Sequence, residues 1–288
     1  MSVAGTRRSD RVCLTLFLEA EGTDSEGRTF KEPARTMLIS QHGAVVVLNR
    51  LLEAGQQMQV RRKAPHESHR HGPVKIIGQF GHQEEGYVYG VSLMETENDL
   101  WGVEFPPIAD SQEAVARMLL ECSYCGGREV IYLNELELAG FESNRCIARL
   151  CKTCGVPSIW AQAPHEDLKK AKARGNGHAT RVQTTPEGTL GERRRAVRLK
   201  ARLTACVRQA GADDELAVCE EISSFGLSFR SRKRYMPPTR IEIAVPYTQG
   251  SANIFVAARV VHSEEIPTAG LFRNGIEYLK PGEFLKEH

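Results

Sequence analysis

The sequence contains no apolar run that approaches the roughly 20 residues of a membrane-spanning helix. Its early apolar stretch, CLTLFLEAEG, is interrupted by Glu19 and Glu21, so we predict neither a membrane span nor a signal peptide and expect a cytoplasmic chain. Disulfide frameworks are rare in that compartment. The eight cysteines therefore indicate metal ligands or free thiols.

Net charge is also scarce. The 288 residues carry a formal charge of +2, which gives no overall attraction to nucleic acid. The balance hides a local excess, because the segment 169–198 has a charge of about +7 and the remainder about −5. We predict that 165–190 begins as a helical turn and continues as a flexible, basic linker. Its lysines could contact phosphates, although a solvated linker is the simpler interpretation because no aromatic residues interleave them.

Two parts of the chain share one pattern of short strands. In the second half, we predict strands near 199–208, 214–221, 225–230, 240–246, 252–262 and 271–278, separated by turn sequences such as QAGADD and TQGSA. In the first half, VCLTLFLEAEG, KEPARTMLI, AVVVLN, QQMQVRR, VKIIGQF and YVYGVSL have the same character. Six short strands at this spacing indicate a small antiparallel barrel in each half.

This organisation predicts a mainly β chain of four parts: a barrel in 1–108, a helix and a cysteine-rich unit in 109–164, the linker in 165–190 and a second barrel in 191–288. The helix is predicted over SQEAVARMLLE, with Ser111 as its N-cap and Glu121 as its last residue. Because the linker separates them, we expect the cysteine unit and the second barrel to fold independently.

The cysteine-rich unit contains two CxxC pairs. Cys122 and Cys125 are followed by glycine, as are Cys151 and Cys154, and 25 residues separate the pairs. Each pair can bind one tetrahedral metal from a tight turn, so four thiolates predict a structural zinc with no open coordination position. Empty, reduced turns or a redox pair are the alternatives. We expect REVIYLNELEL between them to form a hairpin arm and Cys146 to pack within the unit. The remaining cysteines, Cys13, Cys206 and Cys219, are expected in the barrel cores.

Arginines stand just before the first strand of the second half. Arg193, Arg194 and Arg198 precede that strand, and Ser223-x-x-Gly226 follows between the next two. Arginine makes forked hydrogen bonds to phosphate or to the O6/N7 edge of guanine, and it stacks on purines. A serine hydroxyl can bind guanine as well, and glycine permits close approach of the backbone. The pattern therefore favours a phosphate- and guanine-bearing ligand.

The first half repeats this arrangement. Arg7-x-x-x-Arg11 precedes a strand, and Ser40-x-x-Gly43 follows. The arginine-to-serine separation is 29 residues here and 25 in the second half, a difference of one loop.

An Arg-x-x-x-Arg at a strand entrance, followed by Ser-x-x-Gly between strands of a small barrel, resembles the PilZ domain family of bacterial signalling proteins. The resemblance covers about 191–285, and more divergently about 7–108. It implies six-stranded barrels, binding of cyclic di-GMP and no enzymatic activity. The family has Asp or Asn two residues before the serine, whereas this chain has Glu221 in the second copy and Leu38 in the first. Glutamate keeps an acceptor that leucine lacks, so we expect the second copy to bind the ligand and the first to bind it weakly or not at all.

These expectations combine into a receptor or effector in which the second barrel holds cyclic di-GMP and the cysteine unit holds zinc. Two alternatives remain. One is a ligand-free scaffold that uses the PilZ fold to dock a protein partner. The other is a zinc-ribbon regulator whose basic linker contacts nucleic acid. The sequence identifies neither the protein partner nor the oligomeric state.

Overall fold

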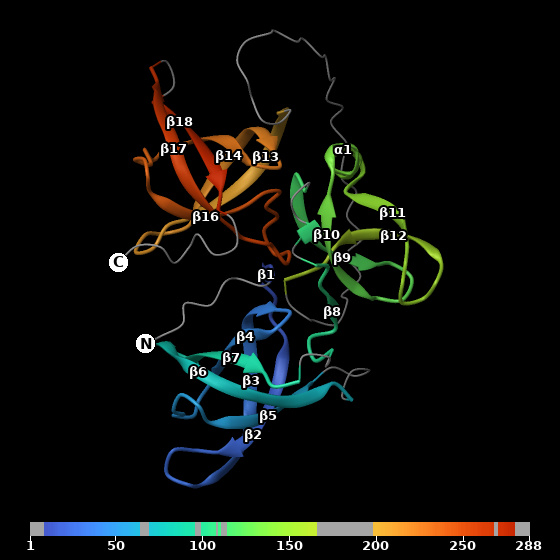
Figure 1. Ribbon diagram of the computed structural model, residues 1–288, viewed down its shortest axis with the longest axis vertical. Coiled ribbons are helices and arrows are strands. Elements are labelled where there is room, and N and C mark those ends of the chain that lie inside the picture. Colours follow the sequence, from blue (N-terminus) through green and yellow to red (C-terminus); the bar gives the residue numbers. More distant parts are fainter. Residues whose placement is uncertain are drawn as a thin grey trace.

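The computed structural model describes residues 9–63, 69–95, 99–107, 109–110, 114–165, 198–267 and 270–279. Their strands form three sheets: two barrels along the long axis of the molecule, and a five-stranded sheet that carries the paired cysteines (Figure 1). The predicted fold class, mainly β with two six-stranded barrels flanking a cysteine unit, is confirmed.

The first barrel closes through six antiparallel strands in the order β2-β3-β4-β7-β6-β5. A short seventh strand, β1, pairs with the end of β3. The strands are β1 Arg11–Val12, β2 Phe17–Thr23, β3 Thr29–Ser40, β4 Gly43–Leu48, β5 Gln57–Arg62, β6 His71–Gln83 and β7 Gly86–Leu93. Apolar residues alternate inward along them, as in β5, where Met58 and Val60 are buried between exposed neighbours.

The second barrel closes in the order β13-β14-β15-β18-β17-β16. Counted along the chain, this is the same strand order as in the first barrel, so the two halves are topological repeats. Its strands are β13 Leu199–Arg208, β14 Glu215–Ser223, β15 Gly226–Ser231, β16 Arg240–Ala244, β17 Val256–Ile266 and β18 Leu271–Tyr278. The register also agrees, since Phe17 is the Cα partner of Arg35 and Thr204 that of Val218. The four extra residues of the first copy therefore lie in its longer β2–β3 hairpin.

One predicted strand is interrupted. VCLTLFLEAEG was expected to form a single strand, but β1 ends at Val12 and β2 begins at Phe17. The Thr36 side chain bridges the break, accepting from the Leu16 amide at 2.8 Å and donating to the Leu14 carbonyl at 2.6 Å. The second copy has a bulge at the equivalent place, between Lys200 and Leu203.

The cysteine unit is a five-stranded sheet in the order β11-β12-β9-β10-β8, with one helix, α1 Glu135–Asn144. Its strands are β8 Val103–Glu104, β9 Ala116–Cys122, β10 Arg128–Leu133, β11 Cys146–Leu150 and β12 Pro157–Gln162. The prediction that REVIYLNELEL forms a hairpin arm is wrong, because only its first six residues form a strand and α1 follows.

The helix predicted over Ser111–Glu121 is also wrong. Residues 111–113 lie outside the described part, and the rest enters β9, an inner strand of the sheet. Met118, Leu119 and Leu120 are all buried, so both faces of this strand are covered. A short continuous apolar run is compatible with a helix or a doubly covered strand, and tertiary packing selected the strand.

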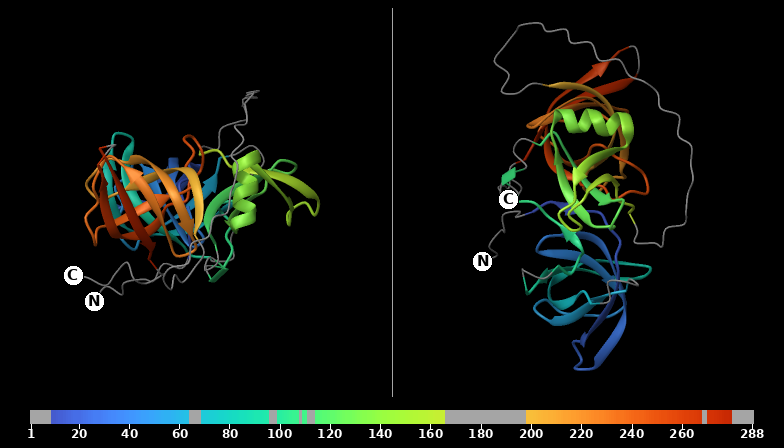
Figure 2. Two further views of the ribbon diagram at one scale, coloured as in Figure 1. Left: turned by 90° about the horizontal axis from the view of Figure 1, so that it is seen from above. Right: turned by 90° about the vertical axis from the view of Figure 1, so that its right-hand side faces the viewer.

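The three parts pack against one another. The cysteine unit lies beside the second barrel in every view (Figure 2), so the expectation that a linker isolates them does not hold. The N-terminal segment joins the two barrels, because Val12 bridges Ile254 and the Cys13 amide donates to the Asn253 carbonyl at 3.0 Å. No helix among the described residues has the length and apolar character to span a membrane. The predicted linker 165–190 lies outside the description except for His165.

Candidate functional site

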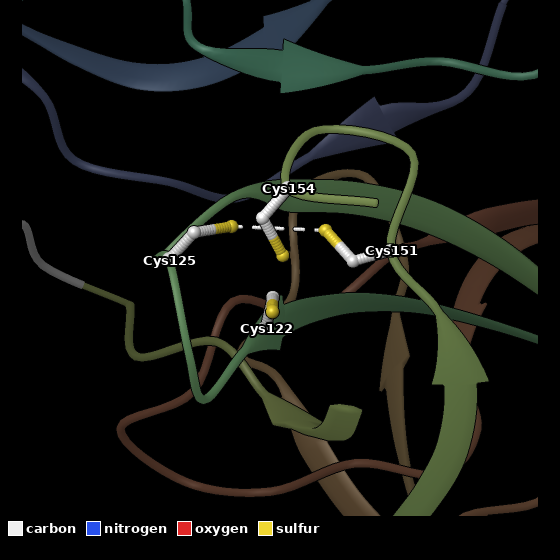
Figure 3. Close-up of side chains that lie close together, drawn as sticks. All are labelled: Cys122, Cys125, Cys151 and Cys154. Atoms are coloured by element: carbon white, nitrogen blue, oxygen red, sulfur yellow. Dashed lines mark hydrogen bonds between the residues drawn. The ribbon is translucent and has the colours of Figure 1, made fainter. Parts of the chain in front are cut away.

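The structure brings the four paired cysteines into one cluster. Their sulfur atoms all lie within 4.8 Å of one another, and the Sγ atoms of Cys125 and Cys151 are 3.7 Å apart (Figure 3). Four sulfurs at ~2.3 Å from a tetrahedral ion are separated by ~3.8 Å. The donor set and its spacing therefore fit a metal ion.

The two CxxC turns have the same backbone geometry. After the first, the Gly126 amide donates to the Cys122 carbonyl at 2.9 Å, and after the second the Gly155 amide donates to the Cys151 carbonyl at 2.8 Å. Both glycines have positive φ, +74° and +72°, a conformation that residues with a Cβ rarely adopt. The Gly127 amide points at the Cys125 sulfur, 3.4 Å away. The two pairs therefore present their sulfur atoms from the same kind of turn.

The protein stabilises negative charge on part of this cluster. Burial opposes ionisation of Cys122, but hydrogen bonds from Ser158 and from backbone amides lower its pKa to about 6. For Cys125 the Gly127 amide lowers the pKa, yet burial and the neighbouring sulfurs outweigh it and raise the pKa to about 12. Four thiolates would repel one another at this distance, and a divalent cation would relieve that repulsion. Cys146 lies on β11 and is not part of the cluster.

The second candidate site is the corner between β14 and β15, which contains the Ser-x-x-Gly motif. Ser223 and Gly226 are Cα partners, and the Ser223 hydroxyl donates to the Gly226 carbonyl at 3.0 Å. A Cβ on Gly226 would lie 2.0 Å from the carbonyl oxygen of Ile276 in β18. The close backbone approach predicted for this glycine is therefore made within the barrel, where β15 packs against β18.

Arg198 lies at this corner. Leu199 pairs with Ile222, so the same register places Arg198 beside Ser223. Its guanidinium forms an ion pair with Glu221, with Nη1 and Oε2 3.5 Å apart. The two motif residues thus contact each other, and both side chains are more than a third exposed. Arg193 and Arg194 lie outside the described residues.

The first barrel repeats the corner without the acid. Arg11 is the Cα partner of Ser40, whose hydroxyl donates to the Gly43 carbonyl at 3.1 Å. Leu38 occupies the register position of Glu221. Arg7 lies outside the described residues.

The neighbour of Arg11 makes a contact that sequence reasoning missed. Asp10 and Arg117 of β9 form an ion pair at 3.7 Å, and their side chains are only 12% and 10% exposed. The Tyr132 hydroxyl also hydrogen-bonds to Asp10, and burial together with this carboxylate raises the pKa of Tyr132. The guanidinium of Arg117 lies 5.8 Å from the Tyr132 ring and 5.7 Å from the Tyr278 ring.

This contact reaches the corner of the second barrel, because the Tyr278 amide donates to the carbonyl of Phe225, inside the Ser-x-x-Gly motif, at 2.8 Å. The segment that enters the first corner is therefore joined through Arg117 to the second corner. No short sequence motif marks Asp10, Arg117 or Tyr278, since they are 107 and 161 residues apart along the chain.

Residues 192–283 match the model of the PilZ domain family. The matched range contains every strand of the second barrel, β13 to β18. No curated protein matches the chain.

Several solved structures are similar in outline. They include the inhibitor of motility MotI/DgrA of Bacillus subtilis, at 10% identity and a TM-score of 0.27 over 96% of this chain and 91% of that chain. MrkH of K. pneumonia, in a complex with c-di-GMP, matches at 8% and 0.25 over 92% and 78%. YcgR of Escherichia coli, also in complex with c-di-GMP, matches at 10% and 0.23 over 92% and 76%. At these TM-scores the likeness carries no argument about function.

Proposed function

We propose that this protein is a cyclic di-GMP receptor whose second barrel holds the ligand at Arg198, Glu221, Ser223 and Gly226, with Arg193 and Arg194 completing the entrance. The observation that supports it most is the PilZ domain match over 192–283. Within that domain, Arg198 and Glu221 already lie together at the Ser-x-x-Gly corner.

The Arg198–Glu221 pair suits a nucleotide site because little stability is lost when a ligand replaces one of the two partners. An exposed ion pair stabilises a fold by only ~0–1 kcal/mol. A phosphate of the ligand would replace the carboxylate on Arg198, and the released Glu221 would accept hydrogen bonds from the donor edge of guanine. Ser223 is buried and donates to Gly226, so it would contribute an acceptor lone pair and hold the corner in shape.

The first barrel is assigned a structural role. Leu38 offers no acceptor where Glu221 stands in the second barrel. In addition, Asp10, beside Arg11, is engaged in a half-buried ion pair with Arg117. Ligand binding by the first corner is expected to be weak or absent.

We further propose that the metal is zinc and that its role is structural. Four thiolates in tetrahedral spacing suit zinc and leave no position for substrate. Cys122, at the end of β9, and Cys151, after β11, would be linked through the ion, which would fix the sheet beside the second barrel. We also propose that the protein is cytoplasmic.

Calorimetric titration with cyclic di-GMP tests the nucleotide site. Arg198→Lys keeps the charge but loses the planar fork, so we expect it to weaken binding about ten- to a hundredfold, nearly as much as Arg198→Ala. Arg232→Lys, beyond the other end of β15, is the matched control and should bind like the parent.

Binding by Arg198→Lys with parental affinity would contradict the proposed fork. If the parent protein does not bind cyclic di-GMP, the proposed receptor function is wrong and the ligand-free docking scaffold is favoured. A salt-dependent gel shift of DNA or RNA would instead favour the nucleic-acid regulator.

Elemental analysis of protein purified without chelators tests the metal. We expect about one zinc per chain, and less than half of that in Cys122→Ser, because three thiolates bind more weakly than four. Cys146→Ser, the matched control outside the cluster, should retain its zinc. Purified parent protein without zinc, or with iron in its place, would contradict the assignment.

A further inference from the structure

The outer face of β13 and β14 leaves two aliphatic side chains in solvent. Leu216 is 63% exposed and Val218 42% exposed, and both point outward from β14. The register gives them outward neighbours, since Val218 pairs with Thr204 on one side and Arg230 on the other. Because both side chains point away from the core of a closed barrel, they are available to contact a partner.

Cations that lack a carboxylate partner flank this pair. The register that joins Val218 to Arg230 places Arg232 opposite Leu216, and Arg232 and Lys233 are both exposed. Arg202 is exposed on β13, two residues before Thr204. In the described part of the chain, none of the three cations forms an ion pair, whereas the nearby Arg230 is paired with Glu220 at 2.7 Å. We call Arg202, Leu216, Val218, Arg232 and Lys233 the β14 face.

The backbone that presents these cations is fixed. Glu215, the residue before Leu216, uses both carboxylate oxygens inside the loop. One accepts from the Arg232 amide at 2.9 Å and the Lys233 amide at 3.3 Å, and the other accepts from the Tyr235 hydroxyl at 2.7 Å. Tyr235 is itself buried, 5.8 Å from the ring of Phe229. A loop held in this way loses little conformational entropy when it binds a partner.

The face continues a surface that this chain already covers. Cys206 on β13 points outward, and its Cα partner is Leu216. Cys206 is buried in a small cluster with Ala244 and Phe255, and Cys13 of the N-terminal segment packs against this cluster. The N-terminal segment thus covers Cys206, whereas Leu216, the next outward residue across the sheet, is exposed.

We propose that the β14 face docks an acidic, amphipathic segment of a partner protein. Two adjacent aliphatic side chains, with Arg202 on the neighbouring strand and Arg232 and Lys233 just beyond β15, match an extended segment that alternates leucine-like and carboxylate side chains. Nucleic acid fits less well, because none of the five residues of the β14 face is aromatic and could stack on a base. Phosphates could contact the cations, but they would offer no apolar contact to the two aliphatic side chains. This docking is independent of the nucleotide site and does not rest on it.

The test uses the full chain and a fluorescent synthetic peptide in which leucine and glutamate alternate. We expect Leu216→Ser and Arg232→Glu each to weaken binding about five- to tenfold in fluorescence anisotropy. Leu136→Ser removes an exposed leucine from α1, and Lys75→Glu reverses an exposed charge on β6, so these matched controls should bind like the parent.

Four results would overturn the proposal. They are absence of peptide binding, equal binding of a peptide that alternates serine and glutamate, equal binding of oligothymidine, and self-association of the parent that Leu216→Ser abolishes. The second would leave charge alone, the third would favour nucleic acid, and the fourth would show that a second copy of this chain occupies the face.

Discussion

At the scale of single residues, the Ser-x-x-Gly motif builds the barrel before it binds anything. The Ser223 and Ser40 hydroxyls donate to Gly226 and Gly43 at nearly the same distance, 3.0 and 3.1 Å. Each glycine also lies against the carbonyl of a neighbouring strand, where a Cβ would be about 2 Å away. The first copy makes these contacts although it has leucine in place of the acid, so the motif alone does not identify a nucleotide site.

Gly226→Ala tests this structural role. The added methyl meets backbone rather than a flexible side chain, so we expect a loss of about 1–3 kcal/mol in the free energy of unfolding, measured with urea. Gly78→Ala on β6, where nothing lies within 4 Å of the added carbon, should stay within about 0.5 kcal/mol. Equal stability of the two variants would show that β15 and β18 can separate at no cost.

At the scale of elements, α1 shows how local signals and packing combine. Asn134 accepts from the Glu137 amide at 2.9 Å, and the Glu137 carboxylate accepts from the Asn134 amide at 3.1 Å. This capping box starts the helix directly after β10. Leu138 and Phe141 then bury the inner side of α1 in the same core cluster as the second barrel.

Asn134→Ala removes one half of this capping box. We expect the variant to lose about 1 kcal/mol of stability, because one helix amide loses its acceptor. Asn144→Ala at the other end of α1 is the control, since its side chain makes only an exposed hydrogen bond to Gly140. Thermal unfolding followed by circular dichroism compares them, and an equal shift in both would argue against the cap.

At the scale of the whole molecule, Arg117 joins three parts of the chain. It pairs with Asp10 of the N-terminal segment and lies against Tyr132 of the cysteine unit and Tyr278 of the second barrel. Removing one partner from a buried ion pair leaves a charge without compensation, which typically costs 3–5 kcal/mol. Arg117 therefore adds a polar connection to the apolar contacts between the parts.

Arg117→Met tests this dependence. We expect a loss of about 3 kcal/mol and a separation of transitions, since the parts would no longer unfold together. The only tryptophans, Trp101 and Trp160, lie outside the second barrel, so their fluorescence can be compared with circular dichroism in a urea titration. Arg273→Met breaks an exposed network with Glu220 and Glu264 and should cost less than about 1 kcal/mol. Coincident, unshifted transitions in Arg117→Met would refute the coupling.

The sequence by itself determined the repeating strands, the two barrels and the cysteine pairs. These depend on alternation, turn residues and ligand spacing, which are local along the chain. Tertiary structure decided that Met118–Leu120 form a strand covered on both faces, that the N-terminal segment lies against the second barrel, and that Asp10, Arg117 and Tyr278 meet. It also decided that Leu216 and Val218 stay exposed. Such outcomes depend on which surfaces pack together in space. The residues involved can be more than a hundred positions apart in the sequence, and a local sequence pattern does not specify contacts between them.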